Sequence, residues 1–403
     1  MIRLLSLYRE AFSDLQRNIW ILSIAMFINR SGSMVLLFTA LYMTKVLHFS
    51  IGQAGLIMSF YGIGSVLGAY LGGWLTDRMN YFNVMLAALI GCGVVLLFML
   101  WATTPVMISI IMFCYPLIGD MFRPANSTAI AAYSTPENRT RSVSLVRLAV
   151  NLGFSIGPAI GGFTALYLGY KWLFLIDAFT SFGAAIMLYL YLPKHPPTMV
   201  RESDSDKQLA SPSAYRDYRY LFFIFLVAVY GTCFFQIFAS VPQFFSHVFQ
   251  YSEDLVGLLM ALNGAIVVVV EMPLILVLEK KKREFSFIIL GTLLLPIAFL
   301  ILLLGKSAIL YSIAYTVVIT LSEIFAMPFM MNYALSRAPK DRQGQYSALY
   351  SIGFGLATIT APVIGLGIAD RFGFNALFYT LISISLLLAI FFYVIRNDKP
   401  IGA

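Results

Sequence analysis

The sequence predicts an all-α polytopic membrane protein with twelve transmembrane helices in two pseudo-symmetric six-helix halves. The composition is 60% hydrophobic and only 11% charged over 403 residues, whereas a soluble domain carries about 25% charged residues. Apolar segments recur along the chain, each near the roughly 20 residues that a helix needs to cross a bilayer core of about 30 Å. A long internal repeat then divides these segments into two sets of six.

The apolar segments follow one another through the chain with short connections. We place them at residues 19–43, 51–75, 82–103, 106–134, 144–168, 171–192, 220–245, 253–278, 285–304, 308–335, 345–369 and 374–395. The segment between the sixth and the seventh is polar, contains Pro, Ser and both charge signs, and cannot bury a core. The predicted organisation is therefore a first half of residues 1–192, a cytoplasmic linker of residues 193–219 and a second half of residues 220–403.

The repeat is visible directly in the sequence. KVLHFSIGQAGLIMSFYG, which begins at Lys45, aligns without gaps with HVFQYSEDLVGLLMALNG, which begins at His247, an offset of 202. Later in each half, an offset of 204 brings Pro124 opposite Pro328. Internal repeats of this length are typical of secondary transporters built from two related halves.

The basic residues indicate the orientation in the membrane. Of the 27 Lys and Arg, most fall at the two ends, in the even-numbered loops and in the central linker. The opposite side carries only Lys45, Lys171, Lys306 and Arg371. The positive-inside rule then places both termini in the cytoplasm of a multi-pass protein of the plasma (inner) membrane. The net charge of +8 is a topology signal rather than a nucleic-acid footprint, and charged residues before the first apolar run argue against a cleavable signal peptide.

No pattern in the sequence indicates enzymatic chemistry. The three cysteines, Cys92, Cys114 and Cys233, lie within apolar spans and are interpreted as small core residues. The three histidines lack metal-ligand spacing, and no hydrolase, kinase or ATP-binding pattern is present. We therefore expect no enzyme, no cofactor and no metal, and any pumping must draw on an ion gradient.

The stretch from Gly119 to Gly162 combines a charged pair with a stripe of small residues. Asp120 and Arg123 stand inside an apolar segment, and a helix follows in which Gly153, Gly157 and Gly161 are spaced four apart. Such stripes let helices approach closely in lipid, where packing drives association. Two further stripes predict close contacts across the two halves: Gly64, Gly68 and Gly72 in helix 2, and Gly353, Ala357, Ala361 and Gly365 in helix 11.

Three motifs resemble those of a known family. GGWLTDR (72–78) is similar to a loop motif between helices 2 and 3, NLGFSIGPAIGG (151–162) to a helix 5 motif associated with antiport, and YKWLF (170–174) to the start of helix 6. The chain thus resembles the major facilitator superfamily, and within it the twelve-helix drug:proton antiporter group. The residues that match the gating and conformational motifs are Gly73, Asp77, Arg78, Gly153, Gly157, Pro158, Gly161 and Gly162.

The resemblance implies a latch near Asp77, because a carboxylate at a helix C-terminus is unfavourable unless a cation or a neighbouring helix N-terminus compensates it. The alternative is that Asp77 and Arg78 only anchor the helix end. The chain also departs from the family pattern. Asn80 replaces the next motif glycine, although Asn can adopt the same left-handed turn. The helix 4 arginine of many antiporters is absent, and Arg123 lies about a turn later.

Charged residues inside the predicted helices are the main candidates for function. A charge near the bilayer centre costs at least about 2.5–3.5 kcal/mol on insertion scales, so it faces a cavity or a partner. The family architecture places helices 1, 4, 7 and 10 around a central cavity. The candidates for the proton or substrate site are Arg30, Asp120, Arg123, Glu323 and Glu271. The alternative for Asp120 is a static ion pair that orients helix 4.

Uncharged polar residues in the spans receive a weaker assignment. Asn29, Gln236, Asn263 and Asn332 are possible substrate contacts, and each can equally be an amide that links helices. Asp177, in helix 6, is interpreted as a structural or periplasmic-facing polar residue.

Together these features predict a secondary active transporter that works by alternating access. We expect proton-coupled efflux of small amphiphilic or hydrophobic compounds. The alternative is a carrier for a specific polar or anionic metabolite, such as an amino acid, peptide or siderophore, with Arg30 and Arg123 as anion-binding groups. A receptor or assembly subunit on the same scaffold is a third hypothesis. The expected partners are a small-molecule substrate, protons and the lipid bilayer, but no nucleic acid, and we expect a monomer.

Overall fold

The chain is described by a computed structural model that covers residues 15–32, 34–134, 139–194, 213–279, 283–305, 309–337 and 343–396. Every regular element within these ranges is helical. The chain forms two compact units, a first of residues 1–35 and 63–203 and a second of residues 36–62 and 204–403. Most of the predicted linker lies outside the described residues, and the predicted boundaries at 192 and 220 stay a prediction.

The helices of each unit follow the predicted spans closely. The first unit holds α2 (Arg17–Gly32), the later part of α4 (Ile51–Arg78), α5 (Tyr81–Leu97), η1 (Phe98–Leu100), α6 (Pro105–Gly119), α7 (Phe122–Ala132), α8 (Arg139–Tyr167) and α9 (Tyr170–Tyr191). The second holds nearly all of α3 (Val35–Lys45), the start of α4, η2 (Ala214–Arg216), α10 (Tyr218–Phe234), η3 (Phe235–Ile237), α11 (Ser240–His247), α12 (Glu253–Glu279), α13 (Glu284–Leu304), α14 (Ile309–Arg337) and α15 (Gln343–Ile395).

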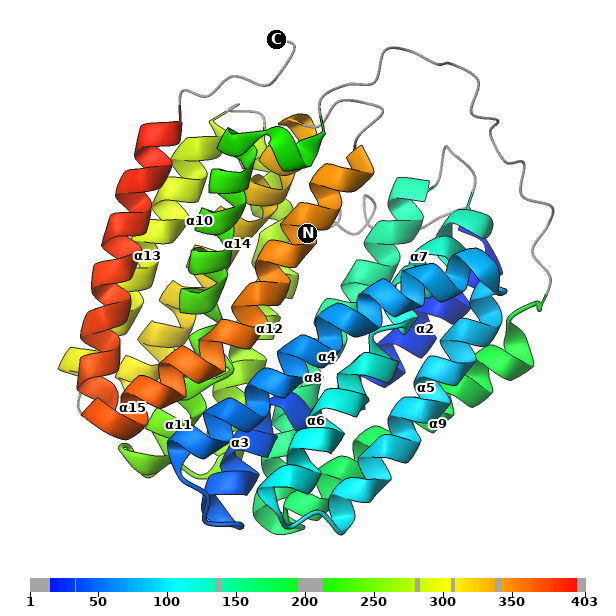
Figure 1. Cartoon of the computed structure of the whole chain (residues 1–403), viewed down its shortest axis with the longest axis horizontal. Coiled ribbons are helices and arrows are strands. Elements are labelled where there is room, and N and C mark those ends of the chain that lie inside the picture. The colour runs from blue at the N-terminus through cyan, green and yellow to red at the C-terminus, as the bar shows by residue number, and fades with distance from the viewer. Residues whose placement is uncertain are drawn as a thin grey trace, which may run out of the picture. The chain divides into compact units, whose positions relative to one another are not determined.

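The described ranges contain eleven helical segments that are long and apolar enough to span a membrane. The last of them covers 48 residues, Ala348–Ile395, which is about twice the length that one crossing needs. It belongs to α15, whose Gly373 has the non-helical angles φ 84° and ψ 165°. In Figure 1 the ribbon of α15 turns back on itself between its orange and red parts. The all-α polytopic fold is confirmed, and α15 contains two of the predicted spans.

The internal repeat also appears in the backbone. Within the described ranges, positive φ angles occur at His48 (57°) and Gln250 (56°), and at Gly169 (94°) and Gly373 (84°). The first pair is separated by 202 residues and the second by 204, the same two offsets that align the sequence. Left-handed backbone is unusual for a non-glycine residue, so its recurrence at matched positions indicates that both copies turn between helices in the same way.

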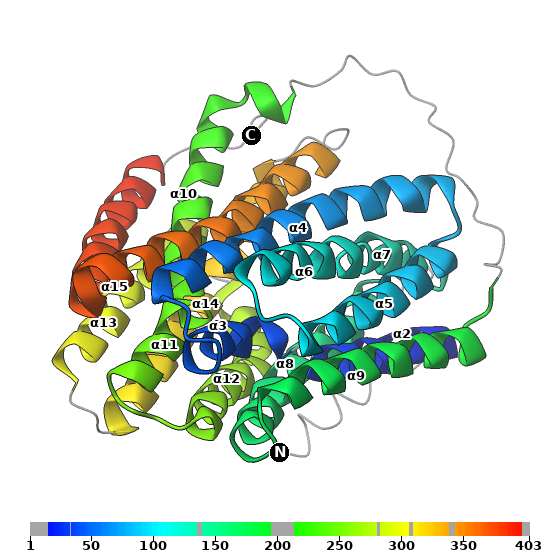
Figure 2. The same cartoon turned by 60° about the horizontal axis from the view of Figure 1, so that its bottom comes forward.

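The glycine stripe of helix 2 packs inside the first unit. A Cβ atom at Gly64, Gly68 or Gly72 would lie 2.2, 2.5 and 2.5 Å from backbone atoms of α6 and of Met121. Figure 2 shows α4 running alongside α6 and α7. The prediction that this stripe makes contacts across the two halves was therefore wrong. The helices are neighbours within one unit, and a stripe of small residues does not by itself indicate which neighbour it serves.

The small-residue stripe of helix 11 also serves its own unit. A Cβ atom at Gly231 of α10 would lie 2.7 Å from the Cβ atom of Ala357, and one at Gly353 would lie 3.3 Å from the backbone oxygen of Ile224. α10 and α15 thus pack closely along much of their length.

A buried ion pair ties α10 to α14 at one end of the second unit. Arg337 donates to both carboxylate oxygens of Asp217, at 2.7 and 2.9 Å, and Tyr346 donates to the same group at 3.1 Å. Burial alone would raise the pKa of Asp217, but the hydrogen bonds from Arg337, from the backbone N–H of Tyr220 and from Tyr346 lower that pKa below its usual value. The carboxylate is thus ionised and caps the first turn of α10.

Candidate functional site

Asp120 lies where helix 4 is interrupted. α6 ends at Gly119 and α7 begins at Phe122, so Asp120 falls in the turn between them. The cause is Pro124, which has no N–H and whose ring would clash with the carbonyl four residues earlier, that of Asp120. The Asp120 carbonyl instead accepts a bond from the N–H of Arg123 at 3.3 Å. A proline therefore places a break in the helix at the candidate carboxylate.

Two helices hold the Asp120 side chain. Ser65 of α4 donates its hydroxyl to Oδ2, and the Nε of Arg123 lies 3.0 Å from Oδ1. Asp120 is 5% exposed, whereas the side chain of Arg123 is 55% exposed. The carboxylate is thus buried inside the unit, whereas the side chain of its cation is mostly exposed.

Glu323 occupies a second polar position, on α14. Its Oε2 accepts a hydrogen bond from Nδ2 of Asn263 at 3.2 Å, and the same amide nitrogen lies 2.9 Å from the hydroxyl of Thr320. Glu271 of α12 is near enough for its charge to act on Glu323. The structure therefore brings together three residues that the sequence indicated separately: Glu323, Asn263 and Glu271.

The sequence analysis missed the polar contacts on the other side of Glu323. Ser322 donates to the carbonyl of Gly291 at 2.7 Å, and its hydroxyl lies 3.0 Å from the hydroxyl of Tyr230. These bonds join α10, α13 and α14 beside the glutamate. The available signals were a tyrosine and a serine inside apolar helices, but a single sequence does not show that Tyr230 and Ser322 face each other.

Arg30 lies near the end of α2, away from the Asp120 pair. Its guanidinium carbon is 5.6 Å from the ring centroid of Phe154, and its Nε is buried without a hydrogen-bond partner among the described residues. The adjacent Asn29 donates to the hydroxyl of Ser181 at 3.3 Å. Within the described ranges no ion pair joins Arg30 to Asp120.

Asp177, interpreted from the sequence as a structural or periplasmic-facing polar residue, lies in the interior of the first unit. It is 1% exposed, and its Oδ2 accepts a hydrogen bond from Tyr115 at 3.1 Å. The residue thus points into the first unit, which rules out a periplasmic-facing side chain. The sequence does not identify its hydrogen-bond donor, because Tyr115 is an ordinary aromatic residue in an apolar span.

All four predicted substrate amides hydrogen-bond to the protein, and the remaining two are Gln236 and Asn332. Gln236 is fully buried, donates to the carbonyls of Thr232 and Ala361, each at 3.0 Å, and accepts from Ser240 at 2.7 Å. Its bonds hold η3 to α15. Asn332 donates to Glu284 at 2.6 Å on an exposed part of α14.

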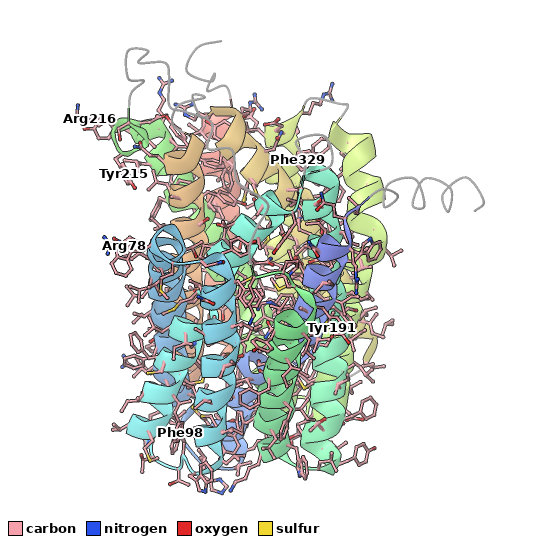
Figure 3. All side chains as sticks on the ribbon, turned by 90° about the vertical axis from the view of Figure 1, so that its right-hand side faces the viewer. Arg78, Phe98, Tyr191, Tyr215, Arg216 and Phe329 are labelled. Atoms are coloured by element: carbon pink, nitrogen blue, oxygen red, sulfur yellow. The ribbon has the colours of Figure 1, made fainter. Side chains whose placement is uncertain are left out.

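The loop motif is only partly described. Arg78 is exposed and stacks on Trp74, with its guanidinium carbon 3.9 Å from the ring centroid. Figure 3 shows Arg78 projecting outward at one end of the first unit and Phe98 lying at the other. A Cβ atom at Gly73 would have no described neighbour within 4 Å. The side chain of Asp77 lies outside the described residues, so the latch stays a prediction.

Asn80 does not adopt a left-handed turn, and that expectation was wrong. Its angles are φ −64° and ψ 127°, and its side chain caps α5 by accepting from the N–H of Phe82 at 2.9 Å. Its Nδ2 donates to the carbonyl of Lys194 at 2.8 Å. The residue therefore serves as a helix cap, a role that asparagine fills well and that requires extended backbone.

The helix 5 stripe contacts helix 1. A Cβ atom at Gly153 would lie 2.6 Å from the Cβ atom of Arg30, and one at Gly157 would lie 3.1 Å from the carbonyl oxygen of Ser31. Pro158 lies inside α8. Gly161 and Gly162 are buried farther along the same helix. The motif thus brings α8 against the segment of α2 that carries Arg30.

No group of three or more His, Cys, Asp or Glu within the described ranges could hold a metal ion. Cys92, Cys114 and Cys233 are free thiols, and the first and last are buried. The chemistry that the candidate residues can perform is proton binding and ion pairing.

Comparison with known proteins identifies the family from the sequence. The chain matches the family model of the Major Facilitator Superfamily over residues 22–353 and 325–403. It is 24% identical to a Na(+), Li(+), K(+)/H(+) antiporter of Planococcus maritimus, over 90% of this chain and 91% of that one. It is 23% identical to Multidrug resistance protein 1 of Bacillus subtilis, over 79% and 81% of the two chains.

A solved structure of a POT family transporter in complex with 5-aminolevulinic acid superposes with a TM-score of 0.81, at 15% identity, over 96% of this chain and 97% of that chain. This likeness concerns the fold. A family match over nearly the whole chain, an all-helical multi-pass fold and charges placed inside it converge on one conclusion. The chain belongs to the major facilitator superfamily, and it is a secondary active transporter rather than an enzyme.

Proposed function

We propose that the protein exports small amphiphilic or hydrophobic compounds in exchange for protons, with Asp120 as the principal proton-binding group. A coupling carboxylate must be buried in the protein yet able to lose or gain its ion-pair partner, so that loading and release occur in different states. Asp120 meets both conditions. It is buried, and it is paired with an arginine whose side chain is mostly exposed.

This geometry is the observation that carries the proposal. The bond from Ser65 and the break at Pro124 hold Asp120 in place. Arg123 approaches from the exposed side at 3.0 Å. When Arg123 swings away, the carboxylate keeps only one neutral hydrogen-bond donor, and binding a proton becomes favourable because an unpaired buried charge is costly.

Glu323 is the counterpart in the second unit. It accepts a hydrogen bond from the uncharged amide of Asn263, and the like charge of Glu271 acts on it. Two neighbouring carboxylates cannot both ionise cheaply inside a membrane protein. We therefore assign Glu323 and Glu271 to a second proton-binding position.

The relatives support ion-coupled export. One is named as an antiporter of alkali cations and protons, and another as a multidrug resistance protein. Both are aligned with this chain over most of its length.

The proposal is tested with purified protein in liposomes under an imposed pH gradient, by following internal pH while ethidium is added as a lipophilic cation. Asp120→Asn keeps the shape of the side chain and can still accept the Ser65 hydrogen bond, so the protein should fold. We expect it to lose substrate-driven proton movement.

Asp370→Asn is the matched control, because it makes the same chemical change on an exposed carboxylate. It should exchange protons as the wild type does. Normal proton exchange by a well-folded Asp120→Asn protein would contradict the assignment and move the role to Glu323 or Glu271.

A second candidate function is a carrier for a polar or anionic metabolite. It is favoured by the arginines, because the buried Nε of Arg30 has no hydrogen-bond partner within the part of the chain that the structure describes, and the side chain of Arg123 is mostly exposed. The same liposomes separate the two functions. Responses to amino acids, peptides or iron chelators, together with silence toward ethidium, would select the carrier.

For the orientation we propose both termini in the cytoplasm, with the protein in the plasma (inner) membrane. The distribution of Lys and Arg supports this. A reporter enzyme that is active only outside the cytoplasm, fused after Ala403, should stay inactive, while the same reporter fused after Lys306 should be active.

A further inference from the structure

A second buried acid lies in the first unit, at a place the Asp120 site does not include. Asp177 of α9 is 1% exposed. Its Oδ2 accepts a hydrogen bond from the hydroxyl of Tyr115 on α6, at 3.1 Å. Within the described ranges no Lys or Arg nitrogen lies within 4.0 Å of it. A carboxylate held by one neutral donor costs far less in its protonated form than in its ionised form.

Arg30 lies near enough for its charge to act on this acid, and it has unused hydrogen-bonding capacity. Its Nε is buried without a hydrogen-bond partner among the described residues, and its guanidinium carbon lies 5.6 Å from the ring centroid of Phe154. An orphaned buried donor is costly and indicates a second arrangement in which the donor is satisfied. Asp177 is the neighbouring acceptor that can satisfy it.

The backbone around Arg30 is built for movement along its neighbours. α2 ends at Gly32, where a Cβ atom would lie 1.8 Å from the hydroxyl oxygen of Thr180 on α9, and α3 begins at Val35. On the other side, Gly153 of α8 faces Arg30 with no side chain between the two helices. The end of α2 is packed closely on both sides, but α8 presents a glycine to it rather than a larger side chain. A shift of the helix end along this contact changes the distance from Arg30 to Asp177.

Resting on the proton coupling proposed above, we propose that Asp177 is a further proton-binding group and that Arg30 displaces its proton when the end of α2 shifts. In the arrangement described here, the acid keeps its proton and is hydrogen-bonded by Tyr115. When Arg30 moves onto it, the proton leaves to water, and the guanidinium balances the carboxylate that remains. The other titratable group facing the acid is Cys92 of α5, whose thiol lies in the field of Asp177, Asp120 and Arg30.

In this arrangement the glycine stripe of helix 5 (α8) has a specific function. The glycines of α8 allow α2 to slide without losing contact, and the sliding segment carries the arginine that controls the acid. Helix movement and proton release are thereby coupled within one unit. Tyr115 is a positioning residue, because it orients the carboxyl group and binds no substrate in this scheme.

The test reads proton binding directly and needs no substrate. Infrared difference spectra of the purified protein between acid and alkaline pH show the carbonyl stretch of each protonated carboxylic acid. We expect Asp177→Asn to lose one such band and Tyr115→Phe to keep that band at a shifted frequency. Replacing the cation by Arg30→Met should let the band persist to higher pH.

Asp120→Asn is the matched control, because it should remove a different band and leave that of Asp177 in place. An unchanged spectrum in well-folded Asp177→Asn, or no frequency shift in Tyr115→Phe, would overturn the proposal. Failure of ethidium to move protons in liposomes would contradict the proposed function alone, since the infrared band reports titration whether or not transport is coupled to it.

Discussion

The contact between α8 and α2 can be tested by adding one methyl group. A Cβ atom at Gly153 would lie 2.6 Å from the Cβ atom of Arg30, and 3.0 Å from two backbone atoms of Arg30 and Ser31. Ordinary carbon contacts are about 3.5–4.0 Å, so Gly153→Ala must push the two helices apart by about 1 Å. Overpacking of this kind costs about 1–3 kcal/mol.

Gly183→Ala provides the matched control, because it adds the same methyl group within α9 where nothing described lies within 4 Å. There the substitution should stabilise the protein by about 0.5–1 kcal/mol, since alanine loses less backbone entropy than glycine in a helix. Thermal unfolding of both purified variants, followed in the same detergent, measures the difference. Two shifts of equal size and sign would refute the close packing of α8 on α2.

Two further predictions concern the polar contacts outside the spans. Asp217→Asn leaves Arg337 buried without its counter-charge and should destabilise the protein by about 3–5 kcal/mol at pH 7. The pKa of Asp217 is lowered in the folded state, so the wild type should lose this stability as the pH falls below about 4 and through that lowered pKa. The Asp217→Asn variant should not show this loss, and equal acid sensitivity of the two proteins in unfolding experiments would contradict the prediction. Asn80→Ala removes the cap that accepts from Phe82 and should cost about 1 kcal/mol, whereas an unchanged unfolding temperature would show that the cap is dispensable.

The fold was predictable because it depends on properties that each segment carries alone. Length and hydropathy define a span without reference to any neighbour. The two repeat offsets recur in the backbone, one at His48 and Gln250 and the other at Gly169 and Gly373. The interruption of helix 4 at Asp120 was also within reach, since Pro124 stands four residues later. The sequence analysis noted that proline only for the repeat.

The pairing of helices was not predictable from one sequence. A stripe of glycines indicates that another helix packs closely against it, but it does not identify that helix. Gly64, Gly68 and Gly72 were therefore assigned to the wrong neighbour. The surroundings of Asp177 were not predictable for the same reason, because Tyr115, which donates to it, and Arg30, whose charge acts on it, are distant in the chain. Sites made by three separate helices carry no local signature.

The central claim is that movement of substrate is coupled to movement of protons. Wild-type protein in liposomes with an imposed pH gradient tests it most directly, when internal pH is followed while ethidium, neutral drugs, alkali cations, amino acids, peptides and iron chelators are added one at a time. The account predicts proton movement on addition of ethidium or neutral drugs, abolished by Asp120→Asn and kept by Asp370→Asn. Silence toward ethidium and neutral drugs in protein shown to be folded would contradict proton-coupled export of such compounds.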